Sequence, residues 1–190
     1  MYKSLIIITL LAPCLSVFQA QAQRYLPRQK GLQITAGTVN GFKLNPLAFH
    51  AGAAFSFYTK HGNRWVFGSE YLEKRYRYKD LKLPQTQFTA EAGYYLKLFS
   101  GGRKTFFFSL GASVLLGYET VNWNKKKLAD GATINHKDGF LYGGALTVEA
   151  EIFITDWLVV LVNVRERVLG GSSVGLFYTQ PGIGLKFIIN

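Results

Sequence analysis

Two pairs of charged residues at the same spacing are the first candidates for chemistry in this sequence. Glu149 and Glu151 lie two residues apart, and Arg165 and Arg167 repeat that spacing further along the chain. Side chains at positions i and i+2 of a β-strand share a face, so the two carboxylates could act as a general acid and a general base. Arginines on a neighbouring strand would instead pair with them across the sheet, and we favour this structural interpretation.

A serine in a glycine-rich segment is the second candidate. Residues 171–175 (GSSVG) match the G-x-S-x-G pattern of a nucleophile elbow. An elbow needs a helix after the serine, whereas the pattern here predicts a strand, so we interpret the segment as an external loop. A lipid-modifying enzyme with Ser173 and His136 is the catalytic alternative. His50, His61 and His136 have no metal-ligand spacing, and we expect no enzyme activity, metal or cofactor.

Basic residues form two clusters in segments that we expect to be external loops. The first is interleaved with Tyr76 and Tyr78 and comprises Lys74, Arg75, Arg77, Lys79 and Lys82. The second comprises Lys125, Lys126 and Lys127. Basic side chains among aromatic ones can bind phosphates or single-stranded nucleic acid. The net charge of +11 fits nucleic acid, lipopolysaccharide phosphates or an acidic protein and does not choose among them. For the two basic clusters we favour pairing of a positive surface loop with lipopolysaccharide, because the electrostatics are not specific.

The elements that would carry these residues are β-strands. Apolar and polar residues alternate with period two, as where Phe88 and Tyr94 share one face and Glu91 and Lys97 the other. We predict eight strands, near residues 31–39, 48–59, 64–74, 84–99, 105–120, 140–154, 157–167 and 176–189. Most of these segments are long enough to cross a bilayer, which takes about 9–11 residues of a tilted strand.

The predicted connections alternate in length. Short turns follow the second, fourth and sixth strands, at residues 60–63, 100–104 and 155–156. Longer links follow the other strands, at residues 40–47, 75–83, 121–139 and 168–175. Outer-membrane barrels have short periplasmic turns and long external loops. We therefore predict an all-β fold: an eight-stranded antiparallel up-and-down β-barrel of outer-membrane type at residues 31–190.

The polar face separates a membrane barrel from a soluble one. A lipocalin-like barrel points its apolar face inward, whereas a membrane barrel points it towards lipid. The polar face here is rich in Gly, Ser, Thr and Ala, which suits the narrow lumen of eight strands. Opposite charges confined there would pair, so we predict a plugged interior. Its expected charged residues are Glu70, Glu91, Glu119, Glu149, Glu151, Lys97, Arg165, Arg167 and Lys186.

The N-terminus has the pattern of a secretory signal peptide. Lys3 precedes an apolar stretch at residues 5–17, and Ala20-Gln21-Ala22 forms a cleavage site. We expect a signal peptide at residues 1–22 and a short periplasmic segment at residues 23–30. Cys14, the single cysteine, lies inside the signal peptide, so the mature chain would have no disulfide bond.

Motifs along most of the chain carry a family resemblance. They are residues 21–27 (QAQRYLP), 58–68 (YTKHGNRWVFG), 87–95 (QFTAEAGYY), 117–123 (GYETVNW), 165–167 (RER) and 184–190 (GLKFIIN). Together they resemble the TraO family of conjugative-transposon proteins from the Bacteroides group. The resemblance implies a part of a DNA-transfer apparatus, related to type IV secretion and acting at the cell envelope, and it brings no catalytic residues. Asn190 departs from the terminal aromatic residue of many outer-membrane barrels.

These observations together predict a non-enzymatic protein in the outer membrane of a Gram-negative bacterium. We expect a structural or docking component of conjugative DNA transfer. The expected partners are outer-membrane lipid and other proteins of the apparatus, with nucleic acid left open. The alternative is a surface-binding barrel whose basic external loops bind DNA or polyanions of a recipient cell.

Overall fold

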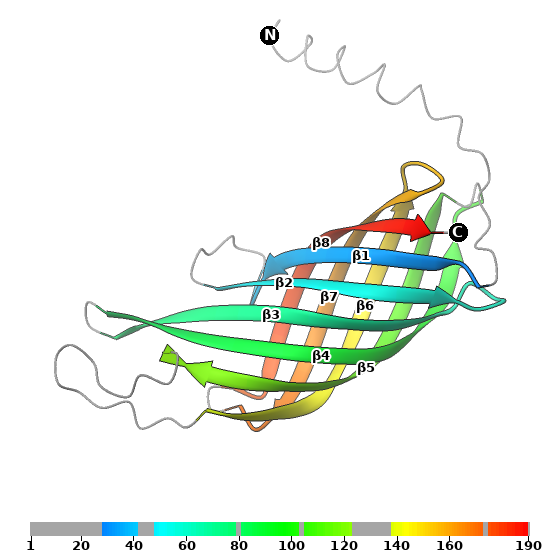
Figure 1. The fold of residues 1–190 in the computed structure, drawn as a ribbon. Helices are drawn as coiled ribbons and strands as arrows, with labels where there is room; N and C mark the ends of the chain where they lie inside the picture. The colour runs from blue at the N-terminus through cyan, green and yellow to red at the C-terminus, as the bar shows by residue number, and fades with distance from the viewer. Residues whose placement is uncertain are drawn as a thin grey trace, which may run out of the picture.

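The chain forms a closed barrel of eight antiparallel strands that pair in chain order (Figure 1). The computed structural model describes residues 28–41, 48–78, 81–102, 105–122, 138–172 and 175–189, without the side chains of 76–78, 81 and 82. The strands are β1 Lys30–Thr38, β2 Ala48–Tyr58, β3 Arg64–Tyr78, β4 Leu81–Ser100, β5 Phe106–Val121, β6 Gly139–Phe153, β7 Leu158–Gly170 and β8 Phe177–Ile189. The last strand pairs with the first, so the predicted up-and-down barrel is confirmed.

The ends of the chain follow from this topology. Lys30 at the start of β1 is paired with Ile189 at the end of β8, so both strands reach the end of the barrel that carries the short turns. We call this the turn end, and the opposite one the loop end. The expected signal peptide, residues 1–22, lies outside the described residues. Within the described part, no helix is long and apolar enough to span a membrane.

The connection after β3 differs from the prediction. We expected a link at residues 75–83, but β3 continues to Tyr78, which is paired with Leu81 of β4. The prediction was wrong because tyrosine has a high strand propensity, and because Pro84 does not end the strand. Pro84 lies one residue beyond the last β4–β5 pair, Gln85 with Val121, so its missing N–H removes no bond to β5. The β3–β4 hairpin therefore extends past β2 at the loop end (Figure 1).

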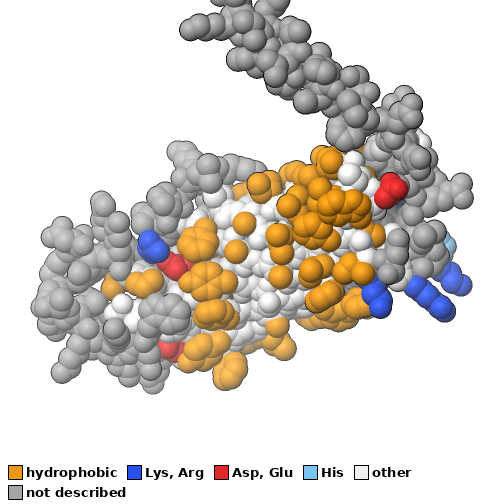
Figure 2. Space-filling model, turned by 45° about the horizontal axis from the view of Figure 1, so that its top comes forward, with side chains coloured by type: hydrophobic (Ala, Val, Ile, Leu, Met, Phe, Trp, Pro, Cys, Tyr) orange, Lys and Arg blue, Asp and Glu red, His pale blue; other side chains and the backbone are white. Residues whose placement is uncertain are grey.

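The alternation of side chains separates a polar interior from an apolar outer wall. Lys186 is fully buried, whereas its neighbour Leu185 is 37% exposed. Phe88 is 47% exposed, and the side chain of Glu91 is 8% exposed inside the barrel. On the face shown in Figure 2 hydrophobic side chains are spread over the wall with other side chains and backbone between them, and charged side chains lie towards its two ends. The arrangement is the inside-out order expected of a barrel in lipid.

Aromatic side chains contact one another across strands in two zones of the outer wall. At the turn end the rings of Trp65 and Tyr94 are 4.8 Å apart. Towards the loop end the rings of Tyr71 and Phe88 are 5.2 Å apart. Between these zones several outward positions are small, namely Ala51, Ala53, Ser69 and Ala90. Two aromatic zones separated by an apolar band are typical of barrels that cross a bilayer.

Candidate functional site: a charge network inside the barrel

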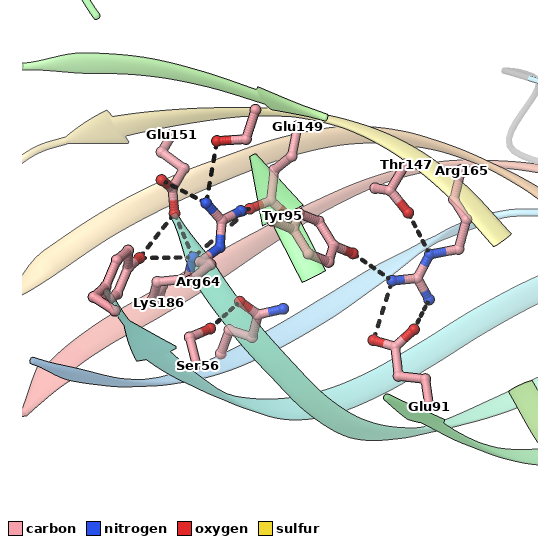
Figure 3. A network of polar contacts seen from close by, with 12 residues as sticks. Ser56, Arg64, Glu91, Tyr95, Thr147, Glu149, Glu151, Arg165 and Lys186 are labelled. Carbon is pink, nitrogen blue, oxygen red and sulfur yellow. Dashed lines mark hydrogen bonds and ion pairs between the residues drawn. The ribbon is translucent and has the colours of Figure 1, made fainter. Parts of the chain in front are cut away.

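A cluster of four charged side chains fills the lumen near the turn end; we call it the turn-side cluster. Arg64, the first residue of β3, pairs with Glu149 and Glu151 of β6, with 3.2 Å between its Nη1 and Glu151 Oε2. Lys186 of β8 pairs with Glu151, and its Nζ lies 3.7 Å from Glu149 Oε1. All four side chains are at most 2% exposed (Figure 3). The cluster therefore joins β3, β6 and β8 across the barrel.

Hydroxyl groups add hydrogen bonds to the turn-side cluster. The Tyr58 hydroxyl donates to Glu151 Oε1 at 3.1 Å and accepts from Lys186 Nζ at 3.1 Å. Ser109 Oγ accepts from Arg64 Nη1 at 3.1 Å. Buried charges are tolerated when opposite charges and additional hydrogen bonds surround them, and this cluster has opposite charges together with the hydroxyls of Tyr58 and Ser109.

A second cluster, the middle cluster, lies further towards the loop end. Arg165 of β7 lies between Glu70 and Glu91, with Nη1–carboxylate distances of 3.2 Å and 2.9 Å. Arg167 Nη1 lies 2.6 Å from Glu70 Oε1, and Gln180 donates to the same oxygen at 2.8 Å. Glu70 therefore connects β3 with β7 and β8.

Tyr95 of β4 joins the two clusters. Its ring lies 4.7 Å from the guanidinium carbon of Arg64, and its hydroxyl accepts from Arg165 Nη2 at 3.2 Å (Figure 3). Gly111 of β5 leaves room for the ring, since a Cβ there would lie 2.6 Å from ring atoms of Tyr95. The Tyr95 ring can therefore pack between the two clusters only because residue 111 is a glycine.

Each cluster balances its own charge. Arg64 and Lys186 face Glu149 and Glu151, while Arg165 and Arg167 face Glu70 and Glu91. A cavity of about 10 Å³ lies between them and is bounded by residues that include Glu70, Glu91, Glu149 and Arg165. Such a volume holds about one water molecule. Side chains thus fill the described lumen, and the network can hold the wall together but leaves little room for a substrate.

Glu119 occupies a separate polar cluster near the loop end. Its carboxylate accepts hydrogen bonds from Gln85 at 2.7 Å, from Gln87 at 2.8 Å and from Ser172 at 2.9 Å. Ser172 belongs to the elbow-like motif. The element that follows this motif is the strand β8, which begins at Phe177, whereas a nucleophile elbow needs a helix there. Ser173 and His136, the pair considered for catalysis, lie outside the described residues.

Two network positions differ from the sequence prediction. Lys97, which the sequence predicts for the network, is inward in register, but it packs against Gly62 at the turn end and forms no ion pair with any described residue. Arg64 was missed, although it lies an even number of residues before Glu70 on β3 and therefore shares its inward face.

The basic clusters are only partly visible. Lys74 and Arg75 lie near the loop end of β3, where Arg75 Nε is 2.6 Å from Glu73 Oε1. Lys79, Lys125, Lys126 and Lys127 lie outside the described residues, as do the side chains of Arg77 and Lys82. Polyanion binding by these loops stays a prediction.

Comparisons with solved structures extend the assignment of the fold. Neisserial surface protein A matches with a TM-score of 0.58 and 13% identity, over 83% of this chain and 96% of that chain. Ail, the attachment invasion locus protein of Yersinia pestis, solved in complex with the heparin analogue sucrose octasulfate, matches with a TM-score of 0.53 and 8% identity, over 85% of this chain and 97% of that chain. Both are outer-membrane β-barrels, and at these identities the likeness shows the fold alone.

The sequence itself decides the family. Comparison with curated proteins finds no match. The family described as "Conjugative transposon protein TraO" matches residues 26–189, which include all eight strands of the barrel. The chain therefore belongs to the TraO family of conjugative transposon proteins.

Proposed function

We propose that this protein is an outer-membrane component of a conjugative-transposon DNA-transfer apparatus related to type IV secretion, and that it has a structural or docking role. The observation that carries the proposal is the barrel itself: a filled lumen inside an apolar wall, in a chain of a conjugative-transposon family. A filled lumen favours a part that holds or recruits other components over one that conducts DNA. Membership in the family connects the barrel to conjugation.

The same geometry favours a role without catalysis. The charged side chains of the two clusters are buried and form ion pairs with one another, and a reactive carboxylate or amine would need access to a substrate. We therefore propose binding and assembly in place of an enzymatic reaction. Ser173→Ala tests the catalytic alternative, because a loss of transfer with normal barrel levels would contradict our proposal.

Membrane placement and the role in transfer are tested separately. Outer-membrane fractions of cells carrying the element should contain the protein, and it should migrate faster on a gel before heating than after, as folded barrels do. Deletion of its gene should abolish transfer, and a plasmid copy should restore it. A protein found only in the soluble periplasmic fraction would contradict the placement, and normal transfer without the protein would contradict the role.

Export through a cleaved signal peptide is part of this proposal. Mass spectrometry of the purified mature protein should find Gln23 at its N-terminus. A mature protein that begins at Met1 would contradict it.

The alternative of a polyanion-binding surface has its own test. The bound heparin analogue belongs to Ail, and for this chain the support is the run of basic residues between β5 and β6 in the sequence. Replacing Lys125, Lys126 and Lys127 with Gln should then lower attachment to recipient cells while barrel levels stay constant. Unchanged mating efficiency would contradict surface binding and leave the docking role in place.

A further inference from the structure

One acidic side chain lies on the apolar outer wall of the barrel. Among strand residues whose side chains are described, the charged ones that point outward are Lys30, Glu73, Arg75 and Glu166. Lys30 is the first residue of β1, and Glu73 pairs with Arg75 close to the loop end. Glu166 is different, because it lies within β7 and is flanked along the strand by Val164 and Val168.

The described neighbours of Glu166 on the outer wall are apolar except for Thr179, its cross-strand partner on β8. Val164 and Val168 are 39% and 45% exposed, and Leu146, its cross-strand partner on β6, is 62% exposed. The loop-side aromatic zone lies beyond it, since Phe177 pairs with Val168 and Tyr142 pairs with Gly170. Val168 is about 7 Å further along the strand, at about 3.3 Å per residue. Glu166 thus lies two residues from the loop-side aromatic zone, on the apolar side of it.

The carboxylate has one hydrogen bond among the described residues. Thr179 Oγ1 of β8 donates to Glu166 Oε2 at 2.5 Å. This bond leaves the second oxygen unmatched by any described donor, and no described cation pairs with the group. Ionisable side chains in membrane-spanning segments are costly and mark functional positions.

We infer that Glu166 and the β6–β8 wall around it form a docking surface for a membrane-spanning segment of another protein of the transfer apparatus, which presents a Lys or Arg side chain at this depth. The inference rests on the proposed function and names the docking site. A cation of the partner would pair with the carboxylate, which no cation of the described residues does. Gly144, an outward position of β6 paired with Val168, lets a partner backbone approach closely.

Charge complementarity favours this partner over the other occupants. Acyl chains of lipids offer no hydrogen-bond donor, and lipid headgroups lie outside the apolar band. A second copy in the same membrane has the same orientation, so its residues keep the same depth. Among the described residues of that second copy, the cations on the outer wall are Lys30 at the turn end and Arg75 at the loop end. Neither lies at the same depth in the membrane as Glu166.

Photo-crosslinking with matched variants tests the inference in cells that transfer the element. A photoreactive phenylalanine analogue replaces Val168 beside Glu166, and in a control it replaces Phe55 on β2, which is 51% exposed. The Val168 probe should give an adduct with one other protein, and the Phe55 probe should not. Glu166→Gln should reduce the adduct and the transfer frequency at least tenfold, while the barrel keeps its heat-modifiable migration. Thr179→Val, which keeps the carboxylate, should leave both readouts near the wild-type level.

A charge exchange then identifies the partner. Glu166→Lys should block transfer, and an acidic substitution at the basic residue of the crosslinked protein should restore it. Full transfer and an unchanged adduct in Glu166→Gln would overturn the inference, as would an adduct with a second copy or with lipid alone. Failure of the proposed function is distinguishable, because transfer would then be normal without the whole barrel.

Discussion

Glu151 shows at the scale of one residue how the interior depends on pairing. Its carboxylate is fully buried and contacts Arg64, Lys186 and Tyr58. A buried ion pair adds little net stability compared with apolar packing, but removing one partner leaves an uncompensated charge. Individual residues of the clusters should therefore be sensitive to single substitution and tolerant of paired substitution.

Lys186→Met gives the first test at this scale. The variant leaves Glu149 and Glu151 with Arg64 as their remaining described cation, and we expect the free energy of unfolding to fall by about 3–5 kcal/mol. Urea titration in detergent micelles, followed by tryptophan fluorescence, measures it. Lys60→Met, at an exposed position of the β2–β3 turn, is the control.

The paired variant sharpens this prediction. Adding Glu151→Gln to Lys186→Met removes the surplus negative charge, so the double variant should recover more than half of the lost stability. Equal stability of Lys186→Met and Lys60→Met would show that the network is dispensable.

At the scale of the elements, the register of neighbouring strands places glycines beside large side chains. Gly111 of β5 is paired with Tyr95 of β4, and both face the lumen. Because Gly111 has no side chain, the ring of Tyr95 can occupy the space above it. This pairing holds Tyr95 between Arg64 and Arg165, so the β4–β5 register positions both clusters.

Gly111→Ala tests the role of this pair. The added methyl group would overlap the Tyr95 ring, and overpacking of this kind costs about 1–3 kcal/mol. We expect lower stability in the same urea titration, and partial recovery when Tyr95→Leu is added. Gly102→Ala is the matched control, since nothing lies within 4 Å of the new Cβ. Equal effects of the two alanines would contradict the packing role of Gly111.

At the scale of the whole molecule, apolar side chains lie on the outer wall of the barrel and charged side chains lie in its interior. The wall exposes Phe140 at 81%, Leu116 at 67% and Ile183 at 66%, while Arg64 and Lys186 are fully buried. Water would disfavour so much exposed apolar surface, whereas lipid would favour it. Substitutions of residues on the outer wall can therefore test whether the barrel lies in a membrane.

Val162→Arg is the test of the wall. Val162 is 45% exposed on β7, and an arginine near the bilayer midplane costs about 2–4 kcal/mol. We expect a lower folding yield into lipid vesicles, read from the heat-modifiable gel band. Asp156→Arg, in the exposed β6–β7 turn, should fold normally. Equal yields for both variants would contradict contact between this wall and lipid.

Much of this structure could be predicted because the alternation of apolar and polar side chains along a strand depends only on neighbouring residues. The period of two decides which residues share a face, so Glu91, Glu149 and Arg167 could be assigned to the interior before any fold was known. The same rule would have found Arg64. The hairpin at residues 75–83 could not be predicted, because a basic and aromatic segment supports either a loop or a strand, and pairing between β3 and β4 decides which.

The sequence by itself determined the number of strands, their faces, the short turns and the family, but not the extent of the β3–β4 hairpin. Only the tertiary structure decided which charges meet. Glu70 pairs with Arg167, 97 residues away, because closing the barrel brings β3 and β7 to opposite sides of one narrow lumen. Partner choice across a lumen depends on the register of every intervening strand pair, and a one-residue shift in any of them would move the partners to different depths.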